Sequence, residues 1–193
     1  MVLDSLIAEI SQRLTTAFAQ LDGWFAAPAP LRAYRPADGG WTIDEILEHV
    51  ALTNHFLLIL IEKGAAKALK NAHGLDLATE LATRQSARAR LDEISQPGAF
   101  KWMRPDHMAP QGLKPGPEVA ATLRQQRQQC LAVLARLPNG EGVLHRTTMS
   151  VHELGKMDVY DFAYFLAKHA ERHLGQIAGV VAEYEAPGRQ EAV

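Results

Sequence analysis

Residues 165–181 read FLAKHAERHLGQIAGVV, a stretch with the periodicity of an amphipathic helix. Apolar and histidine side chains recur here at steps of 4, 3, 4, 4, 3 and 4 residues, which places them on one helical face. That stripe consists of Phe162, Leu166, His169, His173, Ile177, Val180 and Tyr184. Two imidazoles one turn apart on a face turned toward the core need hydrogen-bond partners or a metal ion, because an unpaired polar group is costly to bury.

Three more segments show helical spacing of apolar residues, at about 3–21, 42–70 and 117–137. The helix that carries the two histidines is expected to begin after Asp158, which has the side chain of a helix cap. Long helices separated by loops predict an all-α fold, an antiparallel helical bundle that takes up the whole chain (1–193) as a single domain. Bundles of this kind place metal and ligand sites between facing helices.

A third histidine lies on an inward stripe of the second helix. This helix starts with TIDE at 42–45, the pattern of a capping box. From there, steps of 4, 3, 4, 3 and 4 residues trace a stripe of Thr42, Ile46, His49, Thr53, Phe56 and Leu60. His55 comes six residues after His49 and is rotated away from the stripe, so we expect it to be exposed.

His49, His169 and His173 are therefore candidate ligands of one metal ion. Three imidazoles suit zinc, nickel, iron or copper and leave a position open for water or substrate, as in catalytic sites. The zinc-protease helix motif and its inverted form are excluded, because Ala170 and Arg172 stand where those motifs need glutamate. The alternative is that all three are core histidines bonded to carbonyl or carboxylate oxygens.

The remaining segments give weaker signals. A polar, alanine-rich stretch at 76–94 predicts one extra, more exposed helix, and its charged residues are expected to form a solvated face: Arg84, Arg88, Arg90, Asp92 and Glu93. A loop rich in proline and glycine follows at 96–117, which either has a function or packs over a helix end. A further loop or short hairpin is expected at 141–156.

Composition excludes several classes of protein. A net charge of -2 without a basic stripe argues against nucleic acid as a partner. The most apolar run, at 55–61, is too short to cross a membrane, and residues 1–10 lack the basic start of a signal peptide. The single Cys130 excludes an internal disulfide and is expected to be a small core or surface residue rather than a nucleophile. A cytoplasmic protein is predicted.

Two stretches carry a family resemblance, GGWTIDEILEHVALTNHF at 39–56 and YDFAYFLAKHAERHLGQI at 160–177. Both resemble the DinB-like superfamily, which includes the YfiT-like metal-dependent hydrolases and several thiol-dependent transferases and isomerases. The matching positions are Trp41, His49, His169, His173, Gly175, Gln176 and Ile177. The connecting pieces RPDHMAP, KPGPEV and HELGKMDVYDF are also similar to the family.

This resemblance implies a four-helix up-down-down-up bundle and commonly a homodimer. It also implies a divalent metal, zinc, nickel or iron, on His49, His169 and His173. Related enzymes activate a low-molecular-weight thiol (bacillithiol, mycothiol or glutathione) with that metal. The resemblance thus predicts a transferase or hydrolase that acts on a small-molecule substrate through a metal-activated thiol or water. The alternative is a non-catalytic, stress-related bundle protein that binds metal.

Four loop residues are candidates for contacts with such a substrate. They are Arg104, His107, His145 and His152, all in segments that connect the predicted helices. Loops often carry binding residues. The alternative is that each of these four is an ordinary loop residue with no part in binding.

Overall fold

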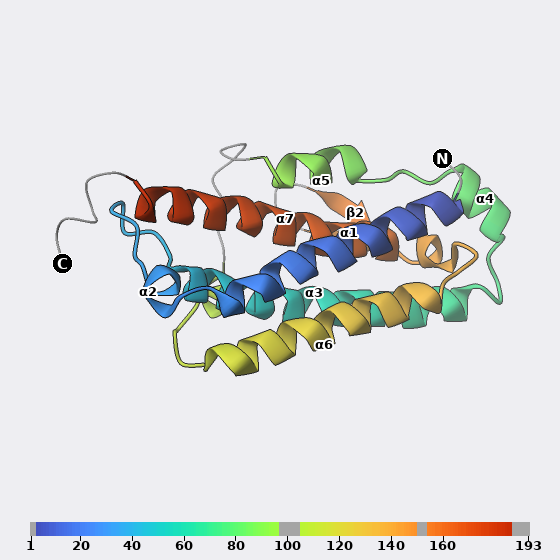
Figure 1. The fold of residues 1–193 in the computed structure, drawn as a ribbon. Helices are drawn as coiled ribbons and strands as arrows, with labels where there is room; N and C mark the ends of the chain where they lie inside the picture. Colours follow the sequence, from blue (N-terminus) through green and yellow to red (C-terminus); the bar gives the residue numbers. More distant parts are fainter. Residues whose placement is uncertain (1–2, 97–104, 150–153, 187–193) are drawn as a thin grey trace.

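The computed structural model describes residues 3–96, 105–149 and 154–186. Four long helices dominate it: α1 (Leu3–Gly23), α3 (Ile43–Asn71), α6 (Gly116–Ala135) and α7 (Val159–Tyr184). In Figure 1, α1 and α7 run in one direction and α3 and α6 in the other, which is the up-down-down-up order. The predicted all-α bundle is confirmed.

Each long helix lies against two others, so the bundle is a four-sided arrangement. Helix α7 packs on α1 and α3, and α6 packs on the same two helices. The apolar positions that face inward have almost no exposed surface; in α1 they are Leu6, Ile10, Leu14, Phe18 and Leu21. Burial of these stripes supplies most of the stability of the helices, because in proteins the packing of an amphipathic face contributes more than the helix propensity of the residues.

The stripe predicted on α7 is buried along its length except at its end. Tyr184 is 36% exposed, so its predicted inward position is wrong. Tyr184 is the last residue of α7, and its ring packs edge-on against that of Tyr34 with the ring centroids 5.3 Å apart. The helix has by then passed the inner part of the bundle.

Capping residues in the sequence correctly predicted where two of the helices begin. Thr42 Oγ1 accepts a hydrogen bond from the Glu45 backbone N–H (3.1 Å), and Glu45 Oε2 accepts one from the Thr42 N–H (2.9 Å). This is the predicted capping box of α3. At the start of α7, Asp158 Oδ1 accepts from the Asp161 N–H at 3.0 Å, as expected for a cap.

Short elements fill the connections. The helical ones are η1 (Trp24–Ala26), α2 (Ala29–Arg32), α4 (Leu77–Ala82), α5 (Arg88–Ile94), η2 (Asp106–Met108) and η3 (Glu141–Leu144). The strands β1 (Thr147–Met149) and β2 (Gly155–Met157) pair antiparallel, with Thr147 opposite Met157, so the hairpin alternative for 141–156 is confirmed. Within the described residues, no helix combines the length and the apolar character that a bilayer crossing requires.

The single extra helix predicted at 76–94 is wrong, because the chain breaks it into α4 and α5. Between them, the side chain of Ser86 donates a hydrogen bond to Asp161 Oδ1 (2.8 Å). The backbone N–H of Ala87 donates to the other carboxylate oxygen of Asp161 (3.3 Å). The Ala87 N–H thus bonds to the first turn of α7 instead of to a helical carbonyl, and the connection between α4 and α5 is held against that turn.

The predicted solvated face is confirmed for Arg90 and Glu93, which are exposed, and is wrong for Arg84. The Arg84 side chain is only 11% exposed, and its guanidinium pairs with Asp158 (2.6 Å) and Asp161 (3.1 Å) at the start of α7. Arg88 also has a partner, because it pairs with Glu9 of α1.

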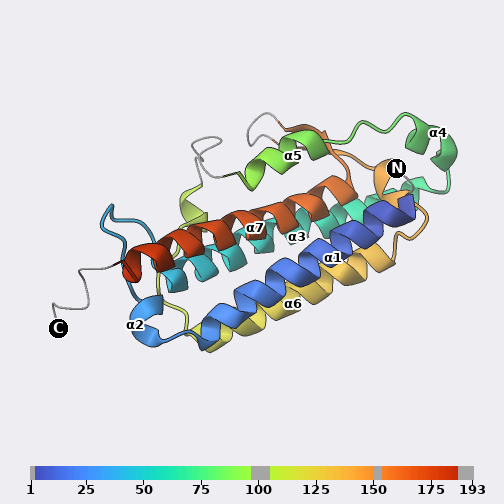
Figure 2. The ribbon, with the colours of Figure 1, turned by 45° about the horizontal axis from the view of Figure 1, so that its top comes forward.

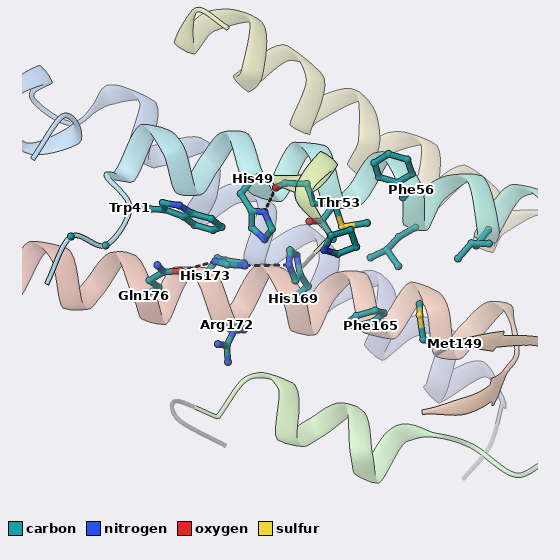
Figure 3. Close-up of a pocket in the computed structure, with 16 residues that line it drawn as sticks. Trp41, His49, Thr53, Phe56, Met149, Phe165, His169, Arg172, His173 and Gln176 are labelled. Carbon is teal, nitrogen blue, oxygen red and sulfur yellow. Dashed lines mark hydrogen bonds between the residues drawn. The ribbon is translucent and has the colours of Figure 1, made fainter. Parts of the chain in front are cut away.

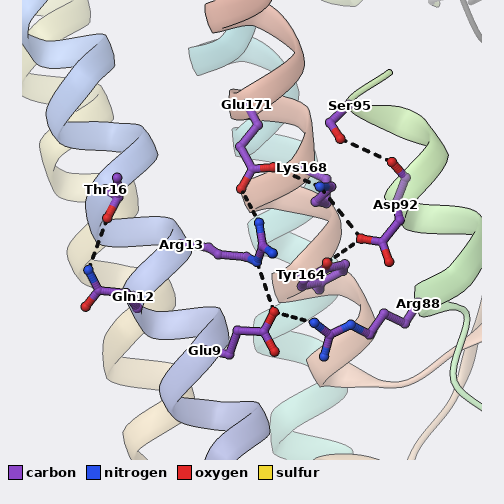
Figure 4. A network of polar contacts seen from close by, with 10 residues as sticks. All are labelled: Glu9, Gln12, Arg13, Thr16, Arg88, Asp92, Ser95, Tyr164, Lys168 and Glu171. Atoms are coloured by element: carbon purple, nitrogen blue, oxygen red, sulfur yellow. Dashed lines mark hydrogen bonds and ion pairs between the residues drawn. The ribbon is translucent and has the colours of Figure 1, made fainter. Parts of the chain in front are cut away.

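Further ion pairs link α5 to α7 and α7 to α1. Figures 1 and 2 show α5 lying along α7, and Figure 4 shows the polar contacts between these helices. Lys168 of α7 lies 3.7 Å from Asp92 and 2.9 Å from Glu171, which in turn accepts a hydrogen bond from Arg13 of α1 at 2.9 Å. This charged network covers the side of α7 that faces away from its two histidines.

Candidate metal centre

The three histidines predicted as ligands lie together inside the bundle. His49 projects from α3 toward α7, and His169 and His173 project from α7 toward it (Figure 3). Their ligand-capable ring nitrogens all lie within 4.8 Å of one another, and each residue is at most 6% exposed. The arrangement brings together residues that are more than a hundred positions apart in the chain, which only the packing of α3 on α7 can achieve.

A backbone carbonyl orients the ring of His49. Its Nδ1 lies 2.7 Å from the carbonyl oxygen of Met108, at the end of η2. A carbonyl only accepts hydrogen bonds, so Nδ1 carries the proton and Nε2 is the nitrogen able to bind a metal. The Trp41 ring packs against the same imidazole with centroids 4.7 Å apart.

A side-chain amide orients the ring of His173. Its Nδ1 lies 2.9 Å from Oε1 of Gln176, one turn further along α7, which leaves Nε2 to face His169. The Nε2 atoms of His169 and His173 are 3.2 Å apart. Two nitrogens bound tetrahedrally at about 2.0–2.1 Å from one zinc ion lie about 3.3 Å apart, close to this spacing.

Burial keeps the two α7 imidazoles neutral. It lowers the pKa of His173 to about 3 and that of His169 well below its usual value. The neighbouring imidazoles and the Arg172 guanidinium lower both further, because a second positive charge nearby is unfavourable. Neutral imidazole is the form that binds metal, so the donor set fits a divalent transition-metal ion.

A cavity of about 460 Å³ opens beside the three imidazoles. One part of its wall is apolar, formed by Phe56, Leu57, Leu60, Met149 and Phe165. The polar contributors are Trp41, Thr53, Arg172 and Gln176. The hydroxyl oxygen of Thr53 is buried and has no hydrogen-bond partner among the described residues. A mostly apolar cavity of this size with a few convergent polar groups is typical of a small-molecule site.

The predicted loop candidates do not join this cavity where the structure describes them. His107 is exposed, and its ring packs edge-on against that of Phe56 with the ring centroids 4.6 Å apart. His145 is half-buried beside Thr147, 3.3 Å from its hydroxyl oxygen. Neither lines the cavity. Arg104 and His152 lie outside the described residues.

Two other expectations are confirmed. His55 is exposed on the outer face of α3. Cys130 is fully buried in α6, and burial raises the pKa of its thiol to about 12, so the reactive thiolate is scarce at neutral pH.

Sequence reasoning missed several parts of the site. Met108 acts through its backbone carbonyl, which leaves no mark in the sequence beyond its place in the RPDHMAP loop. Met149 and Phe165 line the cavity from β1 and from α7, and neither belongs to the two histidine stripes. Arg172 was noted only as the residue that excludes a protease motif, yet it borders the cavity.

A sequence model of the DinB superfamily matches residues 9–177, a span that includes all three histidines. No curated protein matches the chain, and no solved structure does.

Proposed function

The chain belongs to the DinB superfamily, and on that basis we propose that it is a metal-dependent enzyme acting on a small molecule. The observation that carries this proposal is the convergence of three buried imidazoles at the wall of a ligand-sized cavity. A site that is accessible to a small molecule on one side differs from a structural metal site, which is closed by protein ligands.

His49, His169 and His173 would hold the ion, and zinc, nickel or iron suits their nitrogen donors. When bound at such a site, a divalent ion supplies a Lewis acid that favours the deprotonated form of a nearby water or thiol. Water would then hydrolyse the substrate, or a low-molecular-weight thiol, such as bacillithiol, mycothiol or glutathione, would take over a group of the substrate. In the second case the sulfur bonds to that group as its bond to the leaving group breaks, and the thiol proton goes to the leaving group.

The residues around the histidines have separate tasks in this proposal. Met108 and Gln176 fix the tautomers of His49 and His173, so that Nε2 of each ring faces the centre. Thr53 offers a buried hydroxyl to a bound substrate. The apolar wall excludes water, which strengthens every electrostatic contact made within the cavity.

Metal content tests the ligand assignment. Protein prepared without a histidine tag should contain about one ion per chain by inductively coupled plasma mass spectrometry, as three ligands for one ion require. His49→Ala should lose this ion, whereas His55→Ala should keep it, because His55 is an exposed histidine on the same helix. Equal metal content in both variants, or no uptake by the wild type after dialysis against zinc and nickel, would contradict the assignment.

Measurements of turnover test the proposal that the protein is an enzyme. Metal-loaded wild type should consume electrophilic small molecules in the presence of one thiol of the panel, or hydrolyse them without it. His169→Ala should abolish that reaction. If the wild type binds metal but turns over nothing with any of the three thiols or with water, the protein is the non-catalytic alternative and our proposal of an enzyme is wrong.

A further inference from the structure

The loop from η2 to α6 (105–115) supplies the carbonyl that orients His49, although the loop itself is largely exposed. None of its residues is buried, and the side chain of Leu113 is 78% exposed. Burial of apolar surface therefore contributes little to holding the loop in place. Its position depends strongly on polar contacts with α3.

Two adjacent residues of α3 make such contacts. Nδ1 of His49 bonds to the carbonyl oxygen of Met108 (2.7 Å), and Oε2 of Glu48 accepts a hydrogen bond from the backbone N–H of Gly112 (2.8 Å). Glu48 is only 6% exposed. A carboxylate is costly to bury without hydrogen bonds, and a bond from a backbone N–H to a carboxylate is stronger than one between neutral groups. Glu48 is therefore an anchor for the loop.

The chain between the two contacts is short and stiff. Ala109 is extended, with φ -72° and ψ 133°, and it precedes Pro110. The proline ring fixes its own φ and also restricts the residue before it. The N–H of Ala109 donates to the carbonyl of Asp106 (2.9 Å), which closes η2. Fixing Gly112 therefore restricts where the carbonyl of Met108 can lie.

The backbone of Gly112 suits this anchoring. Its φ is +66°, in the left-handed region that residues with a side chain rarely adopt. A Cβ at this position would meet no other atom within 4 Å. A side chain here would thus strain the backbone of the loop without a clash, which makes Gly112 a second place at which the anchor can be weakened.

We propose that Glu48 is a positioning residue of the metal centre. Its carboxylate holds the loop at Gly112, the loop places the Met108 carbonyl, and this carbonyl keeps the proton of His49 on Nδ1. Nε2 of His49 is then free to bind the ion. The inference rests on the proposed function, because it concerns one of the same three histidines. Loss of the anchor should release the loop and allow the proton of His49 to occupy either ring nitrogen.

Long-range proton–nitrogen NMR of metal-free protein at about pH 8, where an ordinary imidazole is neutral, reads the tautomer of His49 directly. Wild type should carry the proton on Nδ1 alone, in signals that His49→Gln removes. Glu48→Leu, which removes the acceptor at similar size, should show both tautomers and bind zinc about tenfold more weakly or worse in chelator competition. Glu48→Gln keeps an oxygen acceptor and should behave as wild type.

A second variant and a control complete the experiment. Gly112→Ala weakens the anchor from the side of the loop, so it should shift both readouts in the same direction, and it keeps the test open if Glu48→Leu does not fold. Glu141→Leu is the matched control. Oε2 of Glu141 also accepts a backbone N–H, that of Asn139 (3.0 Å), but in a loop at the other end of α3. This variant should leave the tautomer and the zinc affinity unchanged.

Four results would overturn the inference: an unchanged tautomer in Glu48→Leu and Gly112→Ala, a changed tautomer with unchanged zinc affinity, the same changes in Glu141→Leu, or equal losses in Glu48→Gln and Glu48→Leu. A purely structural role of Glu48 would lower the free energy of unfolding and leave the tautomer as it is. Because the tautomer is read without metal, a wild type that takes up no zinc would contradict the proposed function and leave this result standing. An unchanged tautomer would in turn leave the metal assignment standing.

Discussion

Each imidazole of the candidate metal centre depends on individual neighbours, and these neighbours can be changed one at a time. Gln176 holds the ring of His173 through a bond of 2.9 Å to Nδ1. Such a partner fixes both the orientation and the tautomer of a metal-binding histidine. We predict that Gln176→Leu weakens zinc affinity by about tenfold or more, measured by competition with a chromophoric chelator.

The matched control is Gln128→Leu, which changes an exposed glutamine on α6. It should leave zinc affinity unchanged. Equal affinities of wild type and Gln176→Leu would show that the amide does not position the ring.

Burial of neutral histidines also makes metal-free protein sensitive to acid. The pKa of His173 is about 3 in the folded protein and about 6.5 when the chain is unfolded, so below pH 6.5 the unfolded state binds a proton that the folded state does not. The free energy of unfolding should therefore fall by about 2 kcal/mol between pH 7 and pH 5 from this residue alone. His169, whose pKa is also lowered, adds to the loss in the same direction.

Chemical denaturation of metal-free protein at the two pH values measures this loss. His173→Leu should show a clearly smaller loss than wild type, because it has no proton to take up at this position. His55→Ala, which removes an exposed histidine, should lose as much as wild type. The same loss in all three proteins would contradict the account of the acid sensitivity.

At the scale of single residues, the sequence predicted the positions of the three histidines but not the groups that bond to them. The spacing along two helices was enough to put His49, His169 and His173 on inward faces, because helix geometry fixes which positions share a face. The carbonyl of Met108 is available in every residue type, so no pattern could identify it. Its position follows from the path of the loop over α3.

Among the elements, the connection between α4 and α5 is anchored to α7 by a buried ion-pair cluster. Arg84 reaches Asp158 and Asp161, whose side chains are 1% and 3% exposed. Replacing the arginine leaves two carboxylates at the start of α7 without their cation, and an uncompensated buried charge is strongly destabilising. We predict that Arg84→Met lowers the free energy of unfolding by about 3–5 kcal/mol, measured by chemical denaturation.

Arg124→Met is the control for this prediction. It breaks a pair of similar length with Asp22 (2.8 Å), but both side chains are at least 36% exposed. Exposed pairs of this kind contribute about 1 kcal/mol or less, so the two variants should differ clearly. A loss of similar size in both would mean that the cluster at the start of α7 is not a distinct anchor.

These elements show which helix boundaries a sequence can reveal. The starts of α3 and α7 were predictable because their caps, Thr42 and Asp158, lie next to the helices that they begin. The break between α4 and α5 was not, because Ser86 and Ala87 in this connection bond to Asp161, more than seventy residues later. A local pattern contains no information about such a partner.

The whole molecule brings the site together through its topology. The long connection through α4 and α5 lets α6 run parallel to α3, and α7 then returns antiparallel along α3 (Figures 1 and 2). In this arrangement, the first part of α3 lies beside the middle of α7, so His49 meets His169 and His173. The helical class could be read from periodicity, whereas the relative heights of the helices depend on loops and side-chain packing that periodicity does not specify.

The most direct test of the central claim is a crystal structure of tag-free protein loaded with zinc, with anomalous diffraction measured at the zinc absorption edge. We predict one strong anomalous peak at about 2.0–2.1 Å from Nε2 of His49, His169 and His173. Absence of a peak among these three rings, or a peak only at exposed histidines such as His55 and His107, would contradict it.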